Sequence, residues 1–307
     1  MKADPVKFNF KALGGACELV LDGLSAAQAQ PHLLAAQQEI QRIETKYSRY
    51  RPGSLLSRLN QQAGLEPVEC DKETLQLFAH ADTLFNISHG LFDITSGVLR
   101  RAWNFNESVL PTAGQLQPFL ALIDWHAVER DDHGVRLGKA GMELDFGGFG
   151  KEYAADRAAT ILLGSGCKHG YVNLAGDFRI LGPKADESPW MIGIKHPRKL
   201  DDVVATIPLE GGALATSGDY ERFIEVNGKR YCHILNPHTG MPASYWQSVS
   251  VLAPLALVAG SYSTIAMLLE EKGLEFLQRS GLPYLAVDQQ GRCYQDQADS
   301  VGQYATA

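Results

Sequence analysis

The chain has 307 residues, of which 45% are hydrophobic and 21% charged, as is usual for a globular protein. Its net charge is −7 with acidic and basic residues intermixed, which argues against binding to a nucleic-acid backbone. No apolar run approaches the roughly 20 residues that span a bilayer, so no membrane span is predicted. The five cysteines form no CxxC pair, which argues against a disulfide framework and a zinc site.

Short strands and long helices alternate irregularly along the chain. In the first third, strands are predicted at 8–13 and 18–21. A long helix is predicted with Pro31 in its first turns and apolar residues at helical spacing from Leu33 to Tyr47, and a second helix over 72–88. The middle predicts strands at 127–129, 135–137, 142–146, 171–174 and 178–181, with a helix over 147–163. The last third predicts strands at 223–226, 229–233, 248–252, 284–287 and 292–294, and helices at 255–269 and 274–280.

The order of these elements predicts an α+β fold. Hairpin-connected strands are common, regular βαβ alternation is missing, and no internal repeat occurs. No linker rich in Pro or Ser divides the chain. We therefore expect residues 1–307 to form a single compact unit with at most two lobes.

A glycine-rich turn at 147–150 separates a predicted strand from a predicted helix. Backbone N–H groups at such a helix start can hold phosphate oxygens, and Lys151 adds a positive charge beside them. The turn matches neither the Walker nor the Rossmann pattern, and a structural glycine turn explains it equally well.

Polar residues gather on both sides of a predicted hairpin whose turn is Asn227-Gly228. Pairing of its strands would bring Ser217 and Asp219 near His233. A Ser-His-Asp hydrolase is conceivable from these three side chains, but no GxSxG elbow surrounds the serine.

Two further segments are ambiguous. Tyr50 could stack on a flat heterocycle, with small polar groups fixing its edges, whereas Ser54 could simply cap a helix that starts at Leu55. Asp177 follows a small-residue turn between two strands, where aspartate is also favoured for local reasons.

Taken together and in order, the polar segments resemble the successive motifs of the ApbE family of FAD:protein FMN transferases. The matching blocks are FKALG, YRPGSLLSRLN, GLFDITSGVL, DFGGFGKEYAAD, NLAGD, ATSGDY and HILNPHTG, at residues 10–14, 50–60, 90–99, 145–156, 173–177, 215–220 and 233–240. The resemblance covers about residues 8 to 270.

The resemblance implies an α+β protein that binds FAD and Mg²⁺. It further implies transfer of FMN from FAD to a threonine hydroxyl of an acceptor protein, with release of AMP. Some relatives instead hydrolyse FAD to FMN and AMP, and a flavin-binding protein without activity is the third possibility. Family members often act outside the cytoplasm, which favours the periplasm, although the sequence shows no export or lipoprotein signal.

The resemblance also assigns roles to individual residues. It implies that His233 and Asp219 are catalytic positions, with His233 as the candidate for proton handling. The flavin-binding positions carried over by resemblance are Leu13, Tyr50, Ser54, Lys151, Asp177, Ser217 and Gly218. The metal positions carried over are the backbone oxygen of Gly150 and the side chain of Thr264.

Three positions depart from the family pattern. Gly260 stands where the family has a metal-binding aspartate, Glu152 where it has glycine, and Asn236 where it has aspartate. We hypothesise that Glu152 replaces the missing carboxylate at the metal. The alternative is a surface glutamate that is favourable near the start of a helix.

Overall fold

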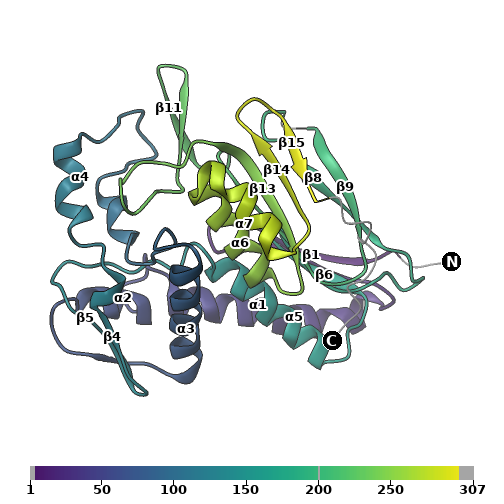
Figure 1. The fold of residues 1–307 in the computed structure, drawn as a ribbon. Coiled ribbons are helices and arrows are strands. Elements are labelled where there is room, and N and C mark those ends of the chain that lie inside the picture. The colour runs from purple at the N-terminus through teal and green to yellow at the C-terminus, as the bar shows by residue number, and fades with distance from the viewer. Residues whose placement is uncertain (1–3, 200, 297–307) are drawn as a thin grey trace.

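The structure is a computed structural model that describes residues 4–199 and 201–296 (Figure 1). A large antiparallel sheet forms its centre. Its strands are β1 (Val6–Ala12), β2 (Gly15–Leu21), β6 (Gly170–Leu174), β7 (Asp177–Gly182), β10 (Ala213–Gly218), β13 (Trp246–Ala253), β14 (Tyr284–Asp288) and β15 (Cys293–Gln295). They pair in the order β1-β2-β6-β7-β10-β13-β14-β15.

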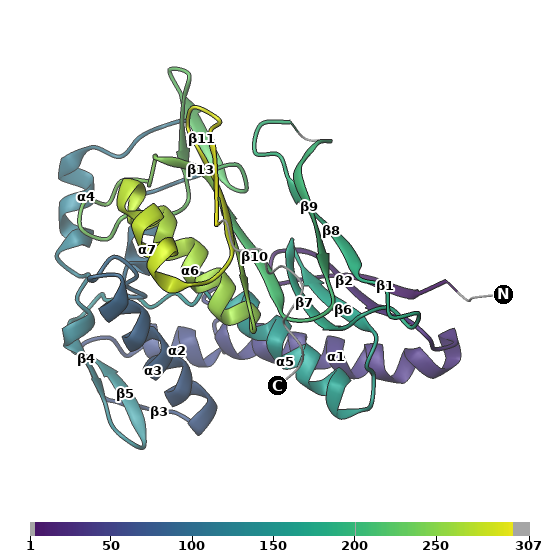
Figure 2. The same ribbon diagram turned by 45° about the vertical axis from the view of Figure 1, so that its right-hand side comes forward.

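Helices cover one face of this sheet. They are α1 (Ala26–Tyr47), α5 (Gly150–Gly164), α6 (Ala256–Leu268) and α7 (Gly273–Ser280). Helix α5 lies between α1 and strands β6 and β7, while α6 packs on β10 and β13 (Figures 1 and 2). The buried face of α5 carries Ala154, Ala155, Ala158 and Ala159, and such small side chains allow close approach on both sides.

A separate β-hairpin covers the opposite face of the sheet. It consists of β8 (Trp190–Lys195) and β9 (Val203–Leu209), with every second residue of β8 buried. Trp190, Ile192 and Ile194 pack on Val20 and Ile180 of the large sheet. The sheet is therefore buried on both faces.

The remaining elements form a lobe beside the sheet, at the left of Figure 1. They are α2 (Leu55–Gln61), α3 (Lys72–Ile87), α4 (Ala113–Leu120), and the short strands β3 (Val68–Glu69), β4 (Val128–Arg130) and β5 (Gly134–Leu137). Two 3₁₀ helices, η1 (Gly97–Arg101) and η2 (Trp125–Ala127), also belong to this lobe, whereas η3 (Glu270–Lys272) connects α6 to α7. A protruding hairpin, β11 (Phe223–Val226) and β12 (Lys229–Cys232), packs Ile224 against Leu99 and Trp103 of this lobe.

The predicted α+β class is confirmed, and the differences in detail have local causes. Residues 142–146 form no strand; only Glu143 makes an isolated bridge, with Ser96. Helix α1 begins at Ala26 because Ser25 and Gln28 form a capping box there. The structure also contains β8, β9, β10 and α4, which the sequence analysis did not predict.

Candidate functional site

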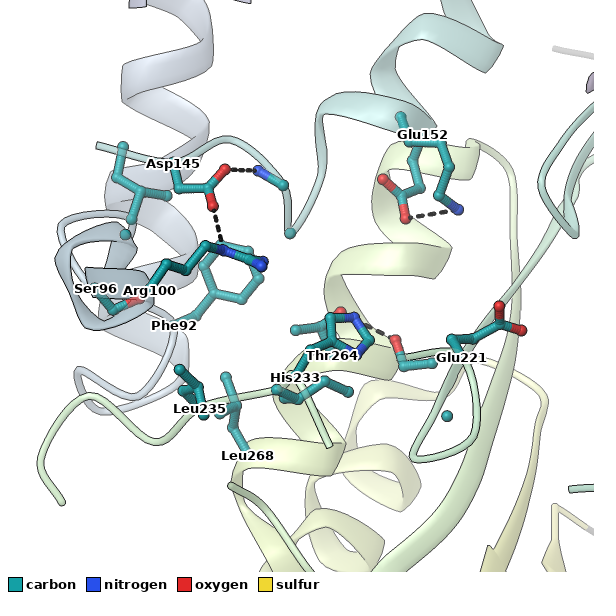
Figure 3. Close-up of a pocket in the computed structure, with 18 of the residues that line it drawn as sticks. Phe92, Ser96, Arg100, Asp145, Glu152, Glu221, His233, Leu235, Thr264 and Leu268 are labelled. Atoms are coloured by element: carbon teal, nitrogen blue, oxygen red, sulfur yellow. Dashed lines mark hydrogen bonds and ion pairs between the residues drawn. The ribbon is translucent and has the colours of Figure 1, made fainter. Parts of the chain in front are cut away.

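A cavity of about 360 Å³ opens between the sheet and the adjoining lobe. Its walls come from the turns after β1 and β6, the segment after α3, the start of α5, the end of β10, both ends of the protruding hairpin, and α6. In Figure 3, Arg100 and Asp145 enter from one side and Glu152 and Glu221 from the other, with His233 and Thr264 between them.

Two tight hairpin turns form one edge of the cavity. Leu13 and Gly14 connect β1 to β2 with φ of 53° and 78°, and Ala175 and Gly176 connect β6 to β7 with φ of 52° and 100°. The two turns lie against each other, since a Cβ at Gly15 would come within 2.6 Å of the Ala175 Cβ. The Leu13 backbone N–H donates to Glu44 Oε1 at 2.9 Å, which fixes the first turn to α1.

The start of α5 forms the floor. Phe149 at its N-cap offers no side-chain hydrogen bond to the first-turn N–H groups, and the turn before it comes close to Phe92. Lys151 points to Asp177, with which it forms an ion pair. Asp177 is buried and also accepts a hydrogen bond from the Thr216 backbone N–H at 3.1 Å. Asp177 thus holds the lysine beside β10.

Hydroxyl groups connect the end of β10 to α6. Ser217 Oγ lies 2.8 Å from Ser263 Oγ and 3.0 Å from Thr264 Oγ1. Ser217 and Thr264 both line the cavity, and so does Gly218. A Cβ at Gly218 would approach the Tyr220 ring to 2.4 Å, so a side chain at this position would force the ring to move.

His233 follows the protruding hairpin and faces the cavity. Its Nδ1 lies 3.2 Å from the Arg222 carbonyl oxygen, so Nδ1 carries the proton and Nε2 is left as an acceptor. Burial, followed by the positive charge of Arg100, lowers the pKa of His233 to about 4. The imidazole is therefore neutral at neutral pH.

Arginines surround Asp145 at the cavity wall. Arg100 Nε donates to Asp145 Oδ2 at 3.0 Å, and Arg49 Nη1 donates to the same oxygen at 3.1 Å. Burial alone would raise the pKa of Asp145, but the two arginines outweigh it and hold that pKa below its ordinary value. The cluster places a cationic guanidinium, that of Arg100, at the cavity surface.

Glu152 is a buried acid in the cavity wall, with 7% of its surface exposed. Its Oε1 lies 3.6 Å from Lys151 Nζ, beyond hydrogen-bond distance. Its Oε2 is buried and has no hydrogen-bond partner. It is therefore not the solvent-exposed helix-start glutamate that we gave as the alternative.

The structure brings some of the predicted site residues together and leaves others apart. Leu13, Lys151, Glu152, Ser217, Gly218, His233 and Thr264 line the cavity, whereas Tyr50, Ser54, Gly150, Asp177 and Asp219 do not. Tyr50 is 73% exposed, with the Arg49 guanidinium over its ring. Ser54 caps α2 by accepting from the Ser57 backbone N–H at 2.9 Å.

Asp219 was paired with His233 in the sequence analysis, but it does not line the cavity. Arg198 binds both of its oxygens, at 2.6 and 2.7 Å, and Gln289 donates to Oδ2 at 3.0 Å. Ser217 does lie on the cavity wall with His233. The expected meeting of all three side chains is therefore only partly present.

Several residues of the cavity wall carry no site assignment from the sequence, among them Phe92, Asp93, Arg100 and Glu221. The first two belong to the GLFDITSGVL block, which we quoted without assigning a site residue to it. Arg100 and Glu221 lie just outside the quoted blocks, and only the fold brings them to the cavity.

The described part of the chain offers no ready-made metal cluster. Within residues 4–199 and 201–296, no group of three or more His, Cys, Asp or Glu side chains is placed to hold an ion. Over the same residues, no helix has both the length and the apolarity needed to cross a membrane.

Comparison with known proteins identifies the family. The sequence profile of the ApbE family matches residues 13–286. The chain belongs to the ApbE family. It is 30% identical to the FAD:protein FMN transferase of Haemophilus influenzae, over 78% of this chain and 73% of that protein. It is 27% identical to the FAD:protein FMN transferase of Salmonella typhimurium, over 92% of this chain and 83% of that protein.

Solved structures of ApbE proteins have the same fold. The ApbE protein of Thermotoga maritima superposes with a TM-score of 0.89 at 33% identity, over 96% of this chain and 97% of that chain. The flavin transferase ApbE of Vibrio cholerae superposes with a TM-score of 0.86 at 25% identity, over 96% and 97% of the two chains.

Proposed function

We propose that this ApbE family member transfers FMN from FAD to a threonine hydroxyl of an acceptor protein, with Mg²⁺ as cofactor and AMP as leaving group. Flavin transfer by an enzyme is the activity that its curated relatives carry in their names. The neutral imidazole of His233, placed in a cavity with a lysine-bearing helix start, is the observation that carries the proposal.

The cavity residues suit the pyrophosphate of FAD. The first-turn N–H groups of α5 lack a side-chain cap, and a helix start of this kind is a ready anion site. Lys151 and Arg100 add two positive charges at the cavity wall. Such charges stabilise the negative charge that builds up on phosphate oxygens during transfer.

His233 is the proposed proton acceptor for the threonine hydroxyl. Its Nε2 is free to accept because Nδ1 is engaged with the Arg222 carbonyl. As the hydroxyl oxygen bonds to the phosphorus of the FMN moiety, its proton passes to Nε2. The bond from that phosphorus to the AMP oxygen breaks, and AMP leaves. A positioned base of this kind contributes about 10²- to 10⁴-fold to a rate.

The residues present fit a divalent cation. Glu152 Oε2 is a buried oxygen without a partner, and Thr264 supplies a hydroxyl on the same cavity wall. Mg²⁺ is usually held by only one or two carboxylates together with substrate phosphates, so the lack of a three-acid cluster does not conflict with it. Bound there, the ion would neutralise pyrophosphate charge.

The test is a set of parallel reactions with FAD, with Mg²⁺ or EDTA, and with or without an acceptor peptide. The peptide carries the acceptor threonine, and a threonine-to-alanine peptide is the matched control. We expect metal-dependent AMP release and flavin bound covalently to the threonine peptide only. Free FMN with AMP would identify a pyrophosphatase instead, and intact FAD in every reaction would identify a flavin-binding protein.

A further inference from the structure

Two hydrogen bonds fix the position of helix α6 along helix α5. Asp156 on α5 accepts from the backbone N–H groups of Ala256 and Leu257 at the start of α6, both at 2.9 Å. Glu152 precedes Asp156 by four residues, and Gly260 follows Ala256 by four residues. The two helices run antiparallel at this contact, so one turn along it Glu152 faces Gly260.

Glu152 and Gly260 share one space. A Cβ at position 260 would lie 2.5 Å from Glu152 Cγ, and 2.8 Å from both its Cδ and Oε1. Contacts this short do not occur between real side chains, so a side chain at position 260 would force that of Glu152 to move. The glutamate carboxylate thus occupies the place that a side chain from position 260 would enter.

The carboxylate of Glu152 lacks an internal partner that would explain its burial. The nearest cation is Lys151 Nζ, 3.6 Å from Oε1, and that amine is already paired with Asp177. Oε2 has no hydrogen-bond partner among the residues that the structure describes. A buried carboxylate is costly unless it is paired or coordinates a metal. This oxygen therefore marks a place for a cation that arrives from the cavity.

We infer that Glu152 is the metal carboxylate of this chain, reaching from α5 into the space that an acid at position 260 of α6 would otherwise fill. The ion would also contact Thr264, one turn beyond Gly260 on α6 and so on the same helix face. Carboxylate and hydroxyl oxygens are suitable ligands for Mg²⁺. The inference rests on the proposed function only for the identity of the ion.

Binding of Mn²⁺, followed by loss of the EPR signal of the free ion, tests the inference without any turnover. The titration is run on the whole protein, alone and with ADP added as a diphosphate that carries no flavin. We expect wild type to bind one Mn²⁺ and Glu152→Gln to bind it at least about tenfold more weakly. Glu221→Gln is the matched control, because it removes the same charge from the same cavity, and its Mn²⁺ affinity should be unchanged.

An exchange of the two positions gives the sharper test. Glu152→Gly should lose Mn²⁺ binding, and the double variant Glu152→Gly/Gly260→Asp should regain it. Both proteins carry glycine at 152, so their difference measures the carboxylate at 260 alone. Gly260→Asp in the wild-type background should melt at a lower temperature, because its Cβ meets Glu152. Melting curves show that the compared variants are folded.

Three results would overturn the inference: Glu152→Gln with wild-type affinity, wild type that takes up no Mn²⁺ even with ADP, or a folded double variant that regains none. Failure of the proposed function looks different. Mn²⁺ binding that depends on Glu152, without any flavin transfer, would refute only the proposed reaction. Metal-dependent transfer that survives in Glu152→Gln would refute only the ligand.

Discussion

Asp219 and Glu152 are both acids in this fold, 3% and 7% exposed, but their surroundings differ. Asp219 has a bidentate pair with Arg198, a second arginine, Arg230, at 3.7 Å, and an amide donor from Gln289. Glu152 keeps one oxygen without a partner, at a cavity. Buried polar groups are nearly always satisfied, so an oxygen without a hydrogen-bond partner at a cavity wall favours a ligand-binding role for Glu152. The carboxylate of Asp219 is satisfied by its neighbours in the fold, whereas that of Glu152 is not.

The largest expected effect comes from a substitution in the cavity, at His233. His233→Gln should lower the rate of FMN transfer by about 10²- to 10⁴-fold, because the proton acceptor is lost. The free energy of unfolding should fall by only about 1 kcal/mol, because the ring loses its hydrogen bond to the Arg222 carbonyl oxygen. Transfer rates and thermal melts measure both. A variant that transfers FMN at the wild-type rate would contradict the assignment.

Asp219→Asn should act on stability. It leaves the Arg198 guanidinium without the counter-charge of a buried carboxylate, and breaking a buried pair costs about 3 kcal/mol. The arginine is partly exposed, which sets the estimate at the lower end of the known range. Urea unfolding measures the change. A variant that unfolds like wild type but no longer transfers FMN would restore Asp219 to a catalytic role.

Glu152→Gln should stabilise the protein in metal-free buffer, whereas Asp219→Asn should destabilise it. Replacing a buried carboxylate that lacks a partner by a neutral amide should raise the free energy of unfolding by about 1 kcal/mol. The same urea series with EDTA measures it. A loss of stability as large as that of Asp219→Asn would show that Glu152 is a structural ion-pair member like Asp219.

Ser54→Ala separates capping from flavin binding. Ser54 caps α2, and removal of an N-cap hydroxyl costs about 1 kcal/mol. FAD affinity, measured by quenching of flavin fluorescence, should stay at the wild-type value because Ser54 does not line the cavity. A tenfold weaker binding would favour the flavin-site role that the sequence resemblance implies.

The smallest effect is on pH dependence. The folded pKa of His233 is about 4, below the ordinary 6.5, so below pH 6.5 the unfolded chain binds a proton that the folded chain does not. Its contribution to stability is complete above pH 6.5 and is lost as the pH falls toward 4. The rate of FMN transfer should likewise fall as the pH is lowered, with a midpoint near pH 4. In His233→Gln, the loss of stability between pH 6.5 and pH 4 should be smaller than in wild type. A wild-type transfer rate with its midpoint near pH 6.5 would contradict the lowered pKa of His233.

Local patterns predicted much of this fold. The Asn227-Gly228 turn placed the protruding hairpin, and apolar spacing placed α3 and α5 within a few residues. Strands β8 and β9 were not predicted. The alternating apolar residues of β8 pack on the large sheet as a second layer, and sequence periodicity does not distinguish such a strand from one at the protein surface. Residues 142–146 look like a strand, but their backbone runs beside η1 and finds only one bridge partner.

The site was predicted less completely, because it depends on distant contacts. Resemblance located Lys151, Ser217, His233 and Thr264, all on the cavity wall. No local signal marks Arg100, whose position follows from its pair with Asp145, forty-five residues away. The departures at 152 and 260 were visible in the sequence, but their contact depends on the packing of α5 against α6. Asn236 does not line the cavity; its side chain closes the turn around His238.

Anomalous diffraction from crystals grown with FAD and Mn²⁺ tests the central claim most directly. We predict one strong manganese peak in the cavity, in contact with the carboxylate of Glu152, with the pyrophosphate of FAD at the start of α5. A manganese peak away from Glu152, or FAD bound outside the cavity, would contradict it.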